Sequence, residues 1–139
     1  VDENVSAGTL VTTIAATDAD QAGTTDSTIT YSIDTATTMF SIDSSAGNVA
    51  VIGALDREIT ETYTLTISAY SSTLTASKIT GTLTITVNDL NDNSPVFTQV
   101  IYTPATSIAE DITTNTAILT VTAADADKLT NGQVTYSIS

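Results

Sequence analysis

Residues 89–97 read Asp89-Leu90-Asn91-Asp92-Asn93-Ser94-Pro95-Val96-Phe97, and they are the most informative part of the 139-residue chain. Four acid or amide side chains fall within five positions, and a proline follows. Carboxylates, amide carbonyls and backbone carbonyls are the ligands that Ca²⁺ prefers, and carboxylates packed this closely repel one another without a cation. The stretch lies between two regions of alternating apolar and polar residues. It therefore predicts a calcium-binding linker between two domains.

The charge of the whole chain agrees with cation binding. Its formal net charge is -13, with Arg57, Lys78 and Lys128 as the only cations and no histidine. A nucleic-acid partner is excluded because no basic surface exists to neutralise phosphates. Apolar residues make up 41% of the chain and recur periodically, which argues against disorder.

The compartment is only weakly indicated by composition. The chain has no cysteine, so disulfide bonds cannot indicate whether its compartment is oxidising or reducing. The Thr- and Ser-rich, Lys-poor composition is common in proteins outside cells. The chain carries neither a bilayer-length apolar run nor an initial signal peptide. We therefore expect any secretion signal or membrane anchor to lie outside these residues.

The chain contains an internal repeat of domain length. Residues 13–20 (TIAATDAD) align with residues 120–127 (TVTAADAD) at an offset of 107, and Glu3 and Glu110 share this offset. Residues 29–33 (ITYSI) match residues 134–138 (VTYSI) at an offset of 105. This period corresponds to a tandem array of domains rather than a short solenoid repeat.

The offset predicts the domain boundaries. We expect residues 1–93 to be one repeat that lacks its first strand and ends in the linker 89–93. Residues 94–139 are expected to be the N-terminal part of a second repeat, so that the chain is a segment of a longer array.

Strand periodicity dominates the first repeat. Ala46-Gly47-Asn48 predicts a turn between residues 40–42 and 49–51. Many short alternating segments without a helical period predict an all-β fold, a Greek-key antiparallel β-sandwich of about seven strands. The residues expected to share an inner face within each strand are Leu10, Ile14 and Ala16 with their counterparts Ala117, Val121 and Ala123; Ile29, Tyr31 and Ile33; Tyr63, Leu65, Ile67 and Ala69; and Leu83, Ile85 and Val87.

The two Asp-Ala-Asp segments do not fit EF-hand loops. An EF-hand needs glycine at position six and a bidentate glutamate at position twelve. Counting from Asp18 these positions hold Gly23 and Ile29, and counting from Asp125 they hold Thr130 and Tyr136. The glutamate is missing both times, so this motif is rejected.

Four acidic signatures in a fixed order resemble those of cadherin repeats. They are Glu3 in Asp2-Glu3-Asn4, the segment Leu55-Asp56-Arg57-Glu58, the linker Asp89 to Asn93, and Asp125-Ala126-Asp127 followed by Asn131-Gly132. The resemblance covers essentially the whole chain. It implies two to three Ca²⁺ ions at the linker, with ligands from both repeats.

The resemblance also implies which residues hold each ion. The outermost ion would be held by Glu3, Asp56, Glu58 and Asp92. The middle ion would be held by Glu3, Glu58, Asp89, Asp92, Asp127 and the backbone carbonyl of Leu90. The third ion would be held by Asn91, Asp125, Asp127 and the backbone carbonyls of Asn93 and Asn131.

One position departs from the family pattern. Ser71 stands where the family usually has an aspartate that serves the preceding linker, so we expect that linker to bind its third ion poorly or not at all. The equivalent ligand of the second repeat would follow Ser139, which leaves the third ion at the linker 89–93 one ligand short in this chain.

Simpler interpretations of single motifs remain open. Leu-Asp-Arg-Glu alone could be a surface ion pair of Arg57 with a carboxylate, which contributes little stability. Asn4-Val5-Ser6 is a formal N-glycosylation sequon, but it adjoins Glu3 at the crowded linker and we expect it to be empty. The outward threonines Thr82, Thr84 and Thr86 are good strand formers, and the resemblance makes them candidate O-glycan sites.

The expected function is a calcium-dependent extracellular adhesion or spacer segment that joins neighbouring repeats and meets a homophilic or heterophilic protein partner. An alternative is a cadherin-like surface or fibre-forming protein of non-animal or microbial type that binds carbohydrate or self-assembles. A glycosidase using Asp56 and Glu58 is disfavoured. Histidine, cysteine and tryptophan are absent and aromatic residues make up 5%, so we expect no enzyme.

Overall fold

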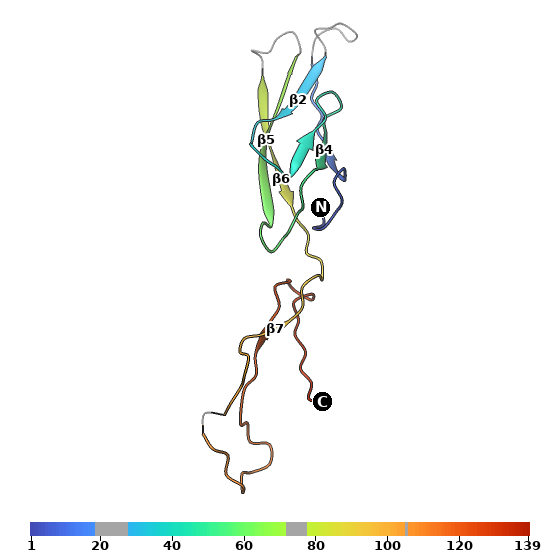
Figure 1. Cartoon of the computed structure of the whole chain (residues 1–139). Coiled ribbons are helices and arrows are strands. Elements are labelled where there is room, and N and C mark those ends of the chain that lie inside the picture. The colour runs from blue at the N-terminus through green and yellow to red at the C-terminus, as the bar shows by residue number, and fades with distance from the viewer. Residues whose placement is uncertain (19–27, 72–77, 105) are drawn as a thin grey trace. The chain divides into compact units, whose positions relative to one another are not determined.

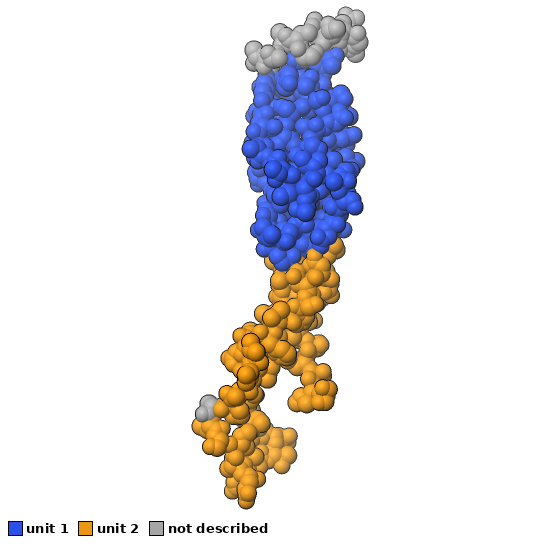
Figure 2. Space-filling view, viewed as in Figure 1, with its two compact units in different colours: residues 1–88 blue, residues 89–139 orange. Residues whose placement is uncertain are grey.

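A computed structural model of the chain describes residues 1–18, 28–71, 78–104 and 106–139. These residues form two compact units, Val1–Asn88 (unit 1) and Asp89–Ser139 (unit 2), which have different colours in Figure 2. Their regular structure consists of strands alone, and none of these four ranges contains a helix able to cross a membrane. Ala19 and Asp20 of the first Asp-Ala-Asp segment, and Gly23, lie outside the described residues.

The described residues of unit 1 form two three-stranded antiparallel sheets (Figure 1). Its core lies between them, so the predicted all-β sandwich is confirmed. The first sheet has the order β1-β4-β3, formed by β1 (Leu10–Thr13), β4 (Asn48–Val51) and β3 (Phe40–Ile42). The second has the order β2-β5-β6, formed by β2 (Ile29–Ile33), β5 (Thr62–Ser71) and β6 (Ile79–Thr86).

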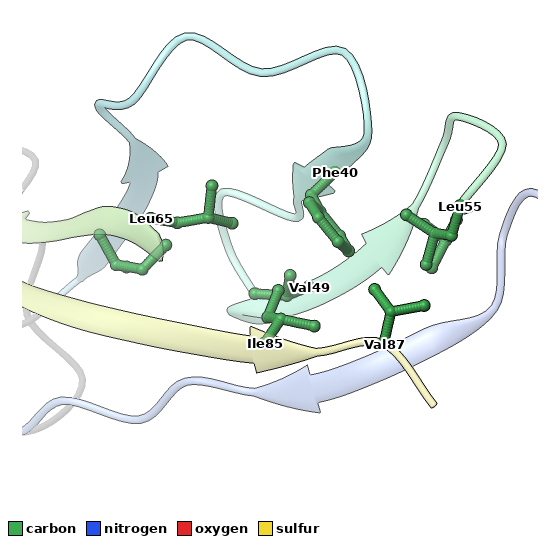
Figure 3. Close-up of a cluster of buried hydrophobic side chains, with 8 residues drawn as sticks. Phe40, Val49, Leu55, Leu65, Ile85 and Val87 are labelled. Carbon is green, nitrogen blue, oxygen red and sulfur yellow. The ribbon is translucent and has the colours of Figure 1, made fainter. Parts of the chain in front are cut away.

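The predicted inward residues of β5 and β6 form one wall of the core. Leu65 and Ile67 of β5 and Ile85 of β6 are buried, while the threonines between them are exposed. This alternation follows from the two-residue side-chain period of a strand. Figure 3 shows Leu65 and Ile85 beside Phe40 and Val49 of the opposite sheet. The buried cluster contains Phe40, Val49, Val51, Leu55, Leu65, Ile67, Ile85 and Val87.

The expected inward position of Leu10 is wrong. Its side chain is 57% exposed, and Val11 packs against the core instead. A bulge between Leu10 and Thr12 shifts the register against β4. Leu10 therefore lies opposite Ala50, whose two neighbours in β4, Val49 and Val51, are the residues that point inward. A bulge inserts an extra residue and reverses the alternation locally.

The predicted turn between β3 and β4 is confirmed, since these two strands pair directly. Gly47 has φ of 70°, in the left-handed region that favours glycine. A Cβ added there would lie 2.3 Å from the backbone oxygen of Ile14. The turn therefore supports the chain after β1, and the N–H of Ile14 donates to the Gly47 carbonyl over 2.8 Å.

The described residues of unit 2 form one short antiparallel pair, β7 (Val96–Phe97) with β8 (Ala123–Ala124). Of the strands expected at residues 117–123 and 134–138, only Ala123 lies in a strand. In unit 1 the equivalent segments pair with β4 and β5, whose counterparts are not among these 139 residues. A segment without a neighbour to accept its hydrogen bonds does not form a ladder.

One tyrosine contact occurs in both units. The backbone N–H of Ala16 donates to the Tyr31 hydroxyl over 3.0 Å, and that of Ala123 donates to the Tyr136 hydroxyl over 2.8 Å. The four residues are repeat counterparts, so the two units share a side-chain contact as well as a sequence pattern.

Candidate metal centre

Glu3 is placed in unit 1 by a short parallel pairing between the N-terminal residues and the end of the sheet. Asp2 forms a bridge with Asn88, and the N–H of Glu3 donates to the Asn88 carbonyl over 3.2 Å. The Glu3 residue is only 1% exposed. One carboxylate oxygen, Oε2, accepts a 2.8 Å hydrogen bond from the backbone N–H of Arg57. Burying a carboxylate requires such a partner, because desolvation penalises an unpaired charge.

The segment 55–58 brings two further carboxylates to Glu3. Leu55 is fully buried in the core, and its carbonyl accepts a 3.1 Å hydrogen bond from the N–H of Asn4. Asp56 begins a turn in which its Oδ1 accepts from the N–H of Ile59 over 3.0 Å. Carboxylate oxygens of Glu3, Asp56 and Glu58 all lie within 4.8 Å of one another. Three predicted ligands of unit 1 thus meet at one point.

Arg57 offsets only part of this negative charge. Its guanidinium is paired with Glu58, so the ion pair considered from the sequence is present, but the Arg57 side chain is 5% exposed rather than on the surface. One cation beside three carboxylates leaves an excess of negative charge. A bound cation would remove the remaining repulsion.

In unit 2, Asp89 and Asp127 are held by donors from each other's segments. Both carboxylate oxygens of Asp89 accept from the N–H of Lys128, at 3.2 and 3.1 Å, and Oδ2 also accepts from Asn131 Nδ2 at 3.0 Å. Asp127 is 6% exposed and accepts from the backbone N–H of Asn93 at 3.2 Å and from its Nδ2 at 2.8 Å. Oxygens of Asp89 and Asp127 lie within 4.8 Å of each other.

The remaining predicted ligands of unit 2 lie on the same two segments. Asp125 accepts from the N–H of Asp127 through its Oδ1 at 3.0 Å. Asp92 accepts from the side chain of Asn93 at 2.8 Å. Leu90, Asn91 and Asp92 are exposed, and none of them belongs to the acidic groups found among the described residues.

Two contacts were not expected from the sequence. Asn88 donates from its Nδ2 to Asp2 at 2.9 Å, and the side chain of Asn131 contacts Asp89. Both pairs are far apart in the chain, so no local pattern could indicate them.

The donor set suits a hard cation. The chain has no histidine or cysteine, so the side chains at both clusters offer oxygen ligands only. Oxygen-only sets of several carboxylates favour Ca²⁺ over Zn²⁺ or copper, which prefer nitrogen and sulfur ligands. These residues therefore fit a calcium ion.

A family model described as the cadherin domain matches residues 1–88. The chain belongs to the cadherin family. This cadherin chain is 40% identical over 137 residues to human Protocadherin Fat 1, covering 98% of the chain and 3% of that protein. It is 37% identical over 137 residues to mouse Cadherin EGF LAG seven-pass G-type receptor 2, covering 99% of the chain and 5% of that protein.

A crystal structure of mouse Cadherin-23 EC22-24 superimposes on the cadherin chain with a TM-score of 0.80 and 29% identity, over 95% of this chain and 42% of that one. The chain therefore spans a small part of its relatives. Cadherin-domain homologues are extracellular or cell-surface adhesion proteins rather than enzymes, and cadherin domains bind Ca²⁺. Membership confirms the predicted fold, family and extracellular location.

Proposed function

We propose that this cadherin segment is a calcium-dependent adhesion or spacer module, in which Ca²⁺ stiffens the joint between tandem repeats. The observation that carries the proposal is the meeting of Glu3, Asp56 and Glu58 within 4.8 Å, with Glu3 almost fully buried. Carboxylates at this separation repel one another, and a cation converts that repulsion into attraction.

The proposed joint uses two to three ions. We assign residues 1–93 to one repeat and residues 94–139 to the start of the next, with the linker 89–93 between them. If each ion takes ligands from both repeats, the repeats can rotate about the linker only when bonds between the ions and their ligands break. The proposed ligands are Glu3, Asp56, Glu58, Asp89, Asn91, Asp92, Asp125 and Asp127 through side chains, and Leu90, Asn93 and Asn131 through backbone carbonyls.

The partner is proposed to be a protein that also presents cadherin repeats, of the same or a different kind. The segment itself would act by keeping neighbouring repeats aligned. Any attachment to a membrane would use sequence outside these 139 residues.

Titration calorimetry of the full chain with CaCl₂ tests the assignment. Asp92→Ala removes a proposed ligand, and Asp111→Ala removes one carboxylate from an exposed position outside the proposed ligand set. We expect Asp92→Ala to lose bound Ca²⁺ and Asp111→Ala to bind as the unmodified chain does. Equal Ca²⁺ uptake by all three proteins would refute the site.

Small-angle X-ray scattering with and without Ca²⁺ tests the mechanical role separately. We expect calcium to narrow the distribution of interatomic distances, because the joint then samples fewer orientations. Calcium binding without that narrowing would retain the site and reject the stiffening.

A further inference from the structure

The side chain of Asn131 contacts a proposed calcium ligand that lies 42 residues away in the chain. Its Nδ2 donates to Oδ2 of Asp89 over 3.0 Å, and Asn131 is half-buried. A carboxylate only accepts hydrogen bonds, so the amide NH₂ must be the end of Asn131 that faces Asp89.

The backbone around Asn131 is folded into a tight turn that presents this amide. The N–H groups of Asn131 and Gly132 both donate to the Lys128 carbonyl, at 3.0 and 3.3 Å, and Leu129 has φ of 52°. At Gly132 an added Cβ would lie 2.2 Å from the backbone oxygen of Asp127. The turn therefore closes tightly against the Asp127 backbone, with Asn131 and the Lys128 N–H directed at one carboxylate.

We infer that Asn131 is a positioning residue that orients the Asp89 carboxylate for calcium. This inference rests on the proposed function and adds a residue role to it. An isolated aspartate rotates about its terminal side-chain bond, whereas the Lys128 N–H and the Asn131 amide together fix the plane of the Asp89 carboxylate. Partners that orient a metal ligand in this way typically contribute 10- to 100-fold in affinity.

The chemistry of the amide suits this task. A neutral donor orients the carboxylate but leaves its full negative charge available to a cation. A lysine or arginine at the same place would orient Asp89 and cancel part of that charge.

The role of the side chain is separable from the proposed role of the Asn131 backbone carbonyl as a ligand. Substitution by alanine removes the amide and leaves the carbonyl in place. Asn131→Ala therefore tests the side chain alone, and Asn131→Gln retains an amide donor on a longer side chain.

The experiment is a double-mutant cycle on the full chain, with CaCl₂ affinity measured by titration calorimetry. We expect Asn131→Ala to weaken Ca²⁺ binding roughly 10- to 100-fold. In the Asp89→Ala background the same substitution should have little further effect. Asn131→Gln should recover part of the affinity, and Gln133→Ala, an exposed neighbouring amide, should bind as the unmodified chain does.

The outcomes separate the inference from the proposed function. If Asp89→Ala binds Ca²⁺ as the unmodified chain does, the proposed site fails and the inference fails with it. If Asp89→Ala weakens binding and Asn131→Ala does not, only the inference is overturned. Equal losses for Asn131→Ala in both backgrounds would also overturn it, because the side chain would then act by shaping the turn rather than through Asp89. An amide NMR spectrum recorded in EDTA checks that each variant is folded.

Discussion

The carboxylate of Glu3 accepts a 2.8 Å hydrogen bond from the backbone N–H of Arg57, a residue 54 positions later in the chain. This contact fixes one oxygen of a buried acid and joins the N-terminal segment to the segment 55–58. The fold of unit 1 therefore places Glu3 beside the segment that carries Asp56 and Glu58. Carboxylates this close repel one another, and a bound cation would relieve that repulsion.

Neutralising Glu3 should have opposite effects with and without calcium. Glu3→Gln removes a charge from beside Asp56 and Glu58. In EDTA we therefore expect unit 1 to be stabilised by at least about 1 kcal/mol, the repulsion of two charges some 4 Å apart in bulk water, because the burial of Glu3 strengthens that repulsion. In millimolar Ca²⁺ the same variant should be less stable than the unmodified chain, because a ligand is lost. Thermal unfolding in EDTA and in Ca²⁺ measures whether the variant is more or less stable than the unmodified chain under each condition.

The sign reversal is the decisive result for Glu3. Destabilisation of similar size under both conditions would mean that Glu3 is only a structural acceptor for Arg57. Glu61→Gln, which neutralises an exposed glutamate outside the cluster, serves as the control and should show no reversal.

Gly47 and Gly81 should respond in opposite directions to alanine. At Gly47 the φ of 70° costs a non-glycine residue about 1–2 kcal/mol, and the added Cβ meets the Ile14 backbone oxygen at 2.3 Å. At Gly81, inside β6, an added Cβ meets nothing within 4 Å, so alanine should stabilise the strand by roughly 0.5–1 kcal/mol. Urea unfolding of both variants checks this, and a Gly47→Ala protein as stable as the unmodified chain would contradict it.

Acid sensitivity should depend on Lys78. The Lys78 ammonium lies 2.8 Å from Asp34 and, with hydrogen bonds from Ser68 and Ser32, holds the pKa of that carboxyl below its usual value of 3.8. Because the folded pKa is the lower one, the stabilisation is present above pH 3.8 and is lost as the pH falls through the folded value. Lys78→Met should raise the Asp34 pKa and move acid unfolding to higher pH.

Carboxyl NMR titration provides an internal control for the Lys78 experiment. The pKa of Asp43 is also held below its usual value, first by the backbone N–H of Ala46 and then by Ser45. Lys78→Met should leave the Asp43 titration unchanged. An unchanged Asp34 titration in the variant would reject the assigned cause.

Alanine at Gly132 should weaken calcium binding without unfolding unit 1. The added Cβ would lie 2.2 Å from the Asp127 backbone oxygen, so the turn that presents Asn131 must open. We expect an affinity loss roughly as large as that of Asn131→Ala, up to 100-fold. Calorimetry measures the affinity, and the unfolding curve of unit 1 in EDTA should not move. Unchanged affinity would show that the turn tolerates a side chain there.

Much of unit 1 was predictable from local patterns. The alternation in residues 62–71 and 79–86 predicts two strands with one buried face, and the turn at Gly47 follows from its residue types. The oxygen-only donor chemistry is likewise a property of composition. These features depend on the side-chain period of a strand and on the preferences of single residues.

The inward face of β1 and the strands of unit 2 were not predictable in this way. Leu10 points outward because a bulge shifts its register against β4, and register is set by the partner strand. The alternation in residues 134–138 is as regular as that of β2, yet no strand forms there among the described residues of unit 2. The alternation of apolar residues indicates which face a strand would bury, but a strand forms only where a neighbouring segment can pair with it.

The sequence by itself determined the sandwich of unit 1, the oxygen-ligand chemistry and the order of the acidic signatures, because these depend on residue type and spacing along the chain. Only the tertiary structure decided that Glu3 receives the Arg57 N–H, that Arg57 is buried beside Glu58, and that Asn131 holds Asp89. Glu3 and Arg57, like Asn131 and Asp89, lie tens of residues apart in the chain. Their contacts exist because the folded backbone brings distant segments together, and no local pattern encodes that proximity.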